Sequence, residues 1–260
     1  MTLLPSDLAA PPSFRLDGKR ALVVGAGRGI GLAAATALCD AGAHVTLVAR
    51  EPDPIEDAAL ALCHRGGRAQ MLQLDVRDAD AVNAALAAHP PFDVLVNNAA
   101  ADRPAPFIEV TATDFDAVMT IDLRATFFVA QSVTRGMIAA GRGGTIINLT
   151  LNPTLQPASV GSTSLLAASK QAIEGLTRAL AIELAPHRIR VNVLASAPAL
   201  ALAPAFIDVS ADATAANAPS SRIVPGRSAD LAGAVVFLAS DASALMTGAS
   251  LVVGGSLTAA

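Results

Sequence analysis

The stretch that most constrains the fold is Lys19–Gly31, which reads KRALVVGAGRGIG. A short apolar run over 21–24 leads into Gly25, Gly29 and Gly31, and a long apolar segment follows. Glycine tolerates the positive φ of a tight turn and lets backbone N–H groups approach a phosphate closely. This order predicts a strand, a turn and a phosphate-binding helix N-terminus, although a purely structural turn would use the same glycines.

The rest of the chain alternates short apolar segments with helical ones. Strands are expected at 20–25, 44–49, 68–74, 92–96, 144–149, 189–194 and 250–253. Helices are expected after the glycine loop and at 53–65, 78–89, 114–140, 165–184 and 228–239. Because short crossovers demand parallel pairing, we predict a single α/β domain with a Rossmann-like, doubly wound parallel sheet of about seven strands. Helices should cover both faces, and the ligand crevice should lie at the carboxyl ends of the strands.

Two segments depart from this alternation. Residues 1–15 are broken by prolines and lack a basic start, which predicts a disordered arm rather than a signal peptide, ahead of one domain over 16–260. The segment 198–225 is rich in Ala, Pro, Ser and Asp. It fits a lid-like insertion over the pocket and a plain surface loop equally well.

Composition limits the classes of partner. The net charge is −4 with no basic block, so we expect no nucleic acid. No apolar run is long enough to span a bilayer, so we expect a cytoplasmic protein without membrane contact. Cys39 and Cys63 fit reduced core thiols, and no cluster has metal-ligand spacing. Hydrophobic residues make up 53% of the chain, which predicts burial between subunits of a homo-oligomer.

Several ordered motifs resemble the classical short-chain dehydrogenase/reductase family, and the resemblance runs from residue 20 to residue 255. The matching residues are a cofactor loop (Gly25, Gly27, Arg28, Gly29, Ile30, Gly31), an adenine contact (Asp75, Val76), a strand end (Asn97, Asn98, Ala99) and a stretch around an active-site lysine (Ala168, Ser169, Lys170). The resemblance implies a nicotinamide dinucleotide at these positions. It also implies a homotetramer or homodimer whose contacts use the helices at 114–140 and 165–184.

Charge indicates which dinucleotide binds. A ribose 2′-hydroxyl favours an acidic partner after the second strand, whereas a 2′-phosphate favours cations. The second strand ends in Val48, Ala49 and Arg50 without an acid, and Arg28 lies in the glycine loop. Two arginines can form charge-assisted hydrogen bonds to one phosphate, so NADP(H) is expected in preference to NAD(H). The alternative is that Arg50 only caps a helix or stays solvated.

The catalytic positions depart from the family pattern. The family's tyrosine, four residues before the lysine, corresponds to Leu166, and the chain contains no tyrosine. The family's serine corresponds to Leu151, and its helix asparagine corresponds to Asp122. Of the four catalytic positions, only Lys170 matches the family.

These departures suggest that ordinary carbonyl reduction is crippled, since a positioned proton donor contributes ~10²–10⁴-fold to the rate. Two hypotheses stay open. The first is a divergent enzyme that acts on a small apolar molecule by atypical or non-redox chemistry, with Lys170 and Asp122 as candidate catalytic groups. The second is a catalytically inactive subunit that partners an active homologue. A conventional NADPH-dependent ketone reductase ranks below both.

Overall fold

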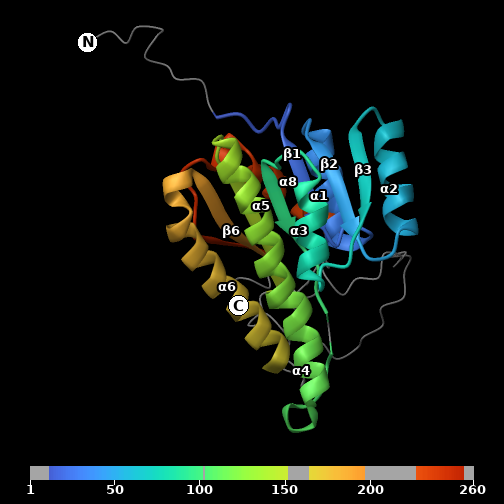
Figure 1. Cartoon of the computed structure of the whole chain (residues 1–260), viewed down its shortest axis with the longest axis vertical. Helices are drawn as coiled ribbons and strands as arrows, with labels where there is room; N and C mark the ends of the chain where they lie inside the picture. The colour runs from blue at the N-terminus through green and yellow to red at the C-terminus, as the bar shows by residue number, and fades with distance from the viewer. Residues whose placement is uncertain (1–11, 102, 152–163, 197–226, 255–260) are drawn as a thin grey trace, which may run out of the picture.

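The computed structural model describes residues 12–101, 103–151, 164–196 and 227–254. Within these ranges seven strands form one parallel sheet in the order β3-β2-β1-β4-β5-β6-β7 (Figure 1). The predicted doubly wound sheet is therefore confirmed. Residues 1–11 of the expected arm, and the whole of the expected insertion at 198–225, lie outside the described residues.

The strands and helices follow each other as the apolar pattern predicts. The strands are β1 (Arg20–Val24), β2 (His44–Ala49), β3 (Arg68–Gln73), β4 (Val94–Asn97), β5 (Gly144–Leu151), β6 (Ile189–Ser196) and β7 (Ser250–Val253). The helices are α1 (Gly29–Asp40), α2 (Asp53–His64), α3 (Ala79–Ala87), α4 (Ala112–Met119), α5 (Thr126–Ala140), α6 (Ser164–Glu183) and α8 (Ala232–Ala239).

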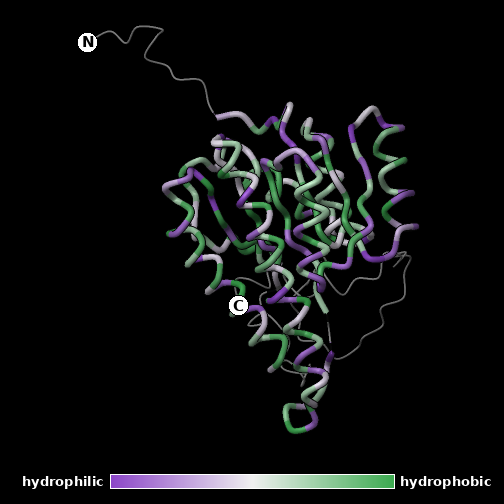
Figure 2. The backbone as a smooth tube through the Cα atoms, viewed as in Figure 1, coloured by the Kyte–Doolittle hydropathy of each residue, from purple (hydrophilic) through white to green (hydrophobic). Residues whose placement is uncertain are grey.

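Alternate residues of β1 enter two separate cores, because successive strand side chains point to opposite faces. Val23 packs with the buried residues of α1, α2 and α8, among them Leu38. Leu22 and Val24 pack on the other face with α3, α5 and α6, among them Val133 of α5. Figure 1 shows α5 and α6 in front of the sheet, and Figure 2 shows hydrophobic residues concentrated in the central part of the domain. Both faces are covered, which explains why the strands are almost entirely apolar.

The sheet has a topological switch point at β1. This strand pairs with β2 on one side and with β4 on the other, so the chain leaves β1 and β4 toward opposite faces of the sheet. In open α/β sheets the ligand crevice forms at such a point, outside the carboxyl ends of the strands. The ends of β1 and β4 therefore mark the place where a ligand would bind.

The region 112–140 differs from the single helix that its periodicity predicts. The structure has α4, then a π-helical turn η3 (Thr120–Ala125), and then α5. Asp122 lies in this π turn, and its Oδ1 accepts a hydrogen bond from the backbone N–H of Ala101 at 2.9 Å. Such wide turns are frequent at functional sites, and a search for 3.6-residue periodicity does not detect their extra residue.

Other boundaries shift because pairing partners decide where an element ends. Strands β5 and β6 run beyond the predicted 149 and 194, since they pair residue by residue as far as Leu151 and Ser196. The domain also takes in residues that the expected arm of 1–15 included. The Phe14 ring lies 6.3 Å from the Phe237 ring, and Arg15 forms an ion pair with Asp17.

We predict that Gly31→Ala destabilises the fold. A Cβ at Gly31 would lie 2.1 Å from the Gly25 carbonyl oxygen and 2.6 Å from Asn98 Nδ2, so the turn after β1 must move. Overpacking of this kind costs about 1–3 kcal/mol, measurable by urea denaturation.

The matched control is Gly175→Ala on α6, where a Cβ meets nothing within 4 Å. There alanine should raise the free energy of unfolding by about 0.5–1 kcal/mol through helix propensity. Equal stability of the two variants would contradict the close packing that we ascribe to Gly31.

Candidate functional site at the carboxyl edge of the sheet

The glycine loop is fixed between the ends of β2 and β4. The backbone N–H groups of Gly25 and Ala26 donate to the Val48 carbonyl at 2.8 and 3.1 Å. Asn98 Nδ2 donates to the Gly25 carbonyl at 2.9 Å. Gly25 has φ +74°, and a Cβ there would lie 2.9 Å from the backbone nitrogen of Ala99. The predicted turn is therefore one that only glycine fits at this position.

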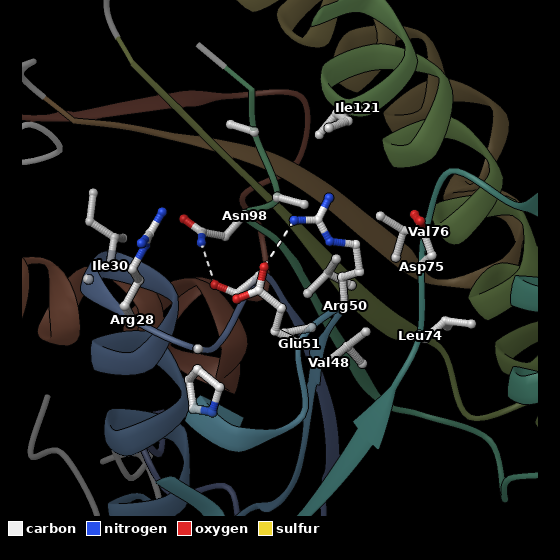
Figure 3. Close-up of a pocket in the computed structure, with 18 of the residues that line it drawn as sticks. Arg28, Ile30, Val48, Arg50, Glu51, Leu74, Asp75, Val76, Asn98 and Ile121 are labelled. Carbon is white, nitrogen blue, oxygen red and sulfur yellow. Dashed lines mark hydrogen bonds and ion pairs between the residues drawn. The ribbon is translucent and has the colours of Figure 1, made fainter. Parts of the chain in front are cut away.

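A cleft of about 870 Å³ opens above this loop (Figure 3). Its walls come from the segments that follow β1, β2, β3 and β4, as the switch point requires. Nine of the expected cofactor residues line it: Gly25, Gly27, Arg28, Gly29, Ile30, Arg50, Asp75, Val76 and Ala99.

Three of the expected cofactor residues are not among those that line the cleft. Gly31 packs beneath the loop against the Gly25 carbonyl. The Asn97 side chain is used inside the sheet, where its Nδ2 donates to Asn148 Oδ1 at 2.9 Å. Lys170 lies on α6, where it pairs with Asp122. Asn98, the neighbour of Asn97 in the matching strand end, lines the cleft instead.

Charged side chains crowd the part of the cleft that follows β2 and β3. Arg50 Nη2 forms a 3.0 Å ion pair with Glu51 Oε1, and Figure 3 shows Glu51 pointing toward Arg50. Arg77 Nε lies 2.9 and 3.0 Å from the two Asp75 carboxylate oxygens. The hydrogen bond from Arg77 lowers the pKa of Asp75, so this carboxyl stays ionised at neutral pH. The sequence analysis did not predict roles for Glu51 and Arg77, although Glu51 directly follows Arg50 and Arg77 directly follows Val76.

A buried ion pair joins α6 to the π turn. Lys170 Nζ lies 2.7 Å from Asp122 Oδ2, and their side chains are 6% and 0% exposed. Ser169 Oγ donates to the same oxygen at 2.8 Å. Ile121, the neighbour of Asp122, lines the cleft, whereas neither Asp122 nor Lys170 is among the residues that line it. The structure thus brings together the two expected catalytic residues and adds Ser169 to them.

A second buried network holds α6 at a fixed height over the sheet. Asn97 of β4 donates to Asn148 of β5, and Asn148 Nδ2 donates to Thr177 Oγ1 of α6 at 2.9 Å. Amide side chains buried in this way are satisfied by one another. The network therefore positions the helix that carries Lys170.

Of the two leucines at the family's catalytic positions, Leu166 lies on the predicted helix, whereas Leu151 lies beyond the predicted end of its strand at residue 149. Leu151 is the last residue of β5. Leu166 lies on α6 one helical turn before Lys170, so both project from one face of the helix. An aliphatic side chain can neither donate nor accept a proton, so neither leucine supplies the acid.

Two further observations concern membrane-spanning helices and metal sites in the described part of the chain. No helix there combines the length and the apolar character needed to cross a membrane. No three or more His, Cys, Asp and Glu side chains come together there in a way that could hold a metal ion.

Comparison with known proteins shows relatives over almost the whole length. The chain is 37% identical to the D-erythrulose reductase of Gallus gallus over 247 residues, which cover 94% of this chain and 97% of that protein. It is 37% identical to the L-xylulose reductase of Bos taurus over 249 residues, which cover 95% and 99% respectively.

These relatives correct the functional expectation. Atypical or non-redox chemistry on an apolar molecule, and an inactive partner subunit, were both wrong, because proteins this similar are named for ordinary reduction of ketoses. The physical error was to give the missing tyrosine too much weight. In nicotinamide-dependent reductases the cofactor carries the hydride, and a lost proton donor lowers the rate of such a reaction without changing its class.

A solved structure and a family model agree with these relatives. A gluconate 5-dehydrogenase from Burkholderia cenocepacia, solved in complex with NADP and tartrate, superposes with a TM-score of 0.81 and is 36% identical; the match covers 95% of this chain and 98% of that one. Residues 25–258 match the family described as enoyl-(acyl carrier protein) reductase. The chain therefore belongs to the classical short-chain dehydrogenase/reductase family.

Proposed function

We propose that this protein is a conventional NADP(H)-dependent oxidoreductase that interconverts a carbonyl and an alcohol on a small polyhydroxylated substrate. The observation that carries the proposal is the cleft at the switch point, which glycine-loop residues and three arginines line. The relatives named for D-erythrulose and L-xylulose support the substrate class, in place of the apolar molecule first expected.

The cleft fits a dinucleotide on its own features. A Cβ at Gly25 would collide with Ala99, whereas a Cβ at Gly29 would meet nothing within 4 Å. The backbone N–H groups in the first turn of α1, which begins at Gly29 and has no side-chain cap, have no acceptor inside the helix. This helix N-terminus favours a pyrophosphate. Arg28 and Arg50 favour an additional phosphate on the ribose, which supports NADP(H) over NAD(H). When bound, the cofactor supplies or accepts a hydride at its nicotinamide ring.

We assign the proton to Lys170. Its ammonium group has three hydrogens, and the contact with Asp122 uses one of them. During reduction, one N–H bond of Lys170 breaks and the proton moves to the substrate oxygen as that oxygen gains charge. The transfer is favourable because an alkoxide is a far stronger base than an amine, and water then returns a proton to Nζ. Asp122 acts as a positioning residue that holds the ammonium in place through the ion pair.

We predict that loss of the Lys170 ammonium lowers kcat by ~10²–10⁴-fold in NADPH-driven reduction of L-xylulose or D-erythrulose. Lys170→Met alone would leave Asp122 buried and unpaired, which costs about 3–5 kcal/mol. The variant to assay is therefore Lys170→Met/Asp122→Asn, in which no buried charge is left.

Ser169→Ala is the matched control, since it removes another donor to Asp122 Oδ2 from the same helix and leaves both charges of the Lys170–Asp122 pair in place. This control should keep kcat within about tenfold of the natural protein. Equal kcat for the control and the double variant would remove Lys170 from the proton step.

We further predict that Leu166→Tyr raises kcat by about tenfold or more, because it places a phenolic hydroxyl one turn before Lys170. Leu166→Phe is the control, since it adds the ring without the hydroxyl. Steady-state rates with saturating NADPH compare the two. If tyrosine and phenylalanine give the same kcat, proton donation at this position does not limit the reaction.

A further inference from the structure

The ion pair between Arg50 and Glu51 lies inside the cleft to which we assign NADP(H). Arg50 is the first residue after β2, and Glu51 follows it. Both line the cleft, their side chains are 61% and 71% exposed, and Nη2 lies 3.0 Å from Oε1 (Figure 3). The guanidinium expected to meet a ribose 2′-phosphate therefore already contacts a carboxylate.

The two other arginines of the cleft, Arg28 and Arg77, differ in whether they are free to contact a ribose 2′-phosphate in place of Arg50. Arg77 is held by both oxygens of Asp75, and its own carbonyl accepts a hydrogen bond from Arg124 at 2.7 Å. Arg28 lines the cleft from the glycine loop, and in the described ranges it has no ion pair. A 2′-phosphate would thus meet one unpaired cation, one paired cation and one carboxylate.

We propose that Glu51 is a specificity-determining residue that weakens NADPH binding and strengthens NADH binding. With NADPH, Arg50 must leave Glu51, or the carboxylate must stay beside a phosphate of the same sign of charge. With NADH, the same carboxylate can accept a hydrogen bond from the 2′-hydroxyl, as acidic residues after the second strand do. The proposal rests on the cleft being the dinucleotide site.

The test is titration of the purified full chain with NADPH and with NADH at low ionic strength, followed by cofactor fluorescence. Glu51→Gln should lower the Kd for NADPH roughly fivefold and raise the Kd for NADH roughly threefold, which is the size that exposed charge contacts reach. The ratio of the two Kd values should therefore shift by about tenfold or more toward NADPH.

Glu56→Gln is the matched control, because it removes the same charge from exposed Glu56 on α2, which is not among the residues lining the cleft. It should leave the Kd ratio unchanged within about twofold. An equal shift in both variants, or no shift with Glu51→Gln, overturns the role of Glu51 while NADPH binding itself stands. If the natural protein binds neither cofactor, the assignment of the cleft fails and the role of Glu51 fails with it.

Discussion

The close approach of backbone to backbone at the end of β1 is the constraint on which the site depends. Gly31 meets the Gly25 carbonyl at a distance that no side chain tolerates, and Gly25 meets Ala99 in the same way. These contacts bring the segments after β1 and β4 together while the chain leaves the two strands toward opposite faces. The cleft is the space that this divergence leaves above the sheet, and its glycine wall is a direct consequence of the packing beneath it.

The part of the site around Lys170 depends on buried polar groups rather than on glycine. The Asn97–Asn148–Thr177 chain fixes α6 over β4 and β5, and the Lys170–Asp122 ion pair fixes it against the π turn. Each group would be costly to bury alone and is acceptable because its partner is present. The lysine is thereby held rigidly on α6 in a chain that contains no tyrosine. A positioned cation is what proton delivery to a developing alkoxide needs.

The sequence was sufficient to predict a parallel sheet and most of the residues that line the cleft, because these follow from local patterns. The apolar strands, the glycines at 25–31 and the arginines at 28 and 50 are all close to one another along the chain or at strand ends. Contacts between distant segments were harder to foresee. The π turn at Asp122 interrupts a helix that looks continuous in the sequence. Asp122 also accepts hydrogen bonds from Ser169 and Lys170, which lie 47 and 48 residues further along the chain. The function was misjudged for a related reason, since a missing side chain shows which group is absent but does not show which neighbour can take its place.

The central claim is that this cleft supports hydride transfer from NADPH to a ketose. The most direct test is to incubate the purified protein with L-xylulose and NADPH in which deuterium replaces both hydrogens at C4 of the nicotinamide, and to examine the product by mass spectrometry and NMR. The account predicts an alcohol with deuterium on the carbon that was the carbonyl. An alcohol without the label, or no alcohol from any of the ketoses reduced by its relatives, would contradict it.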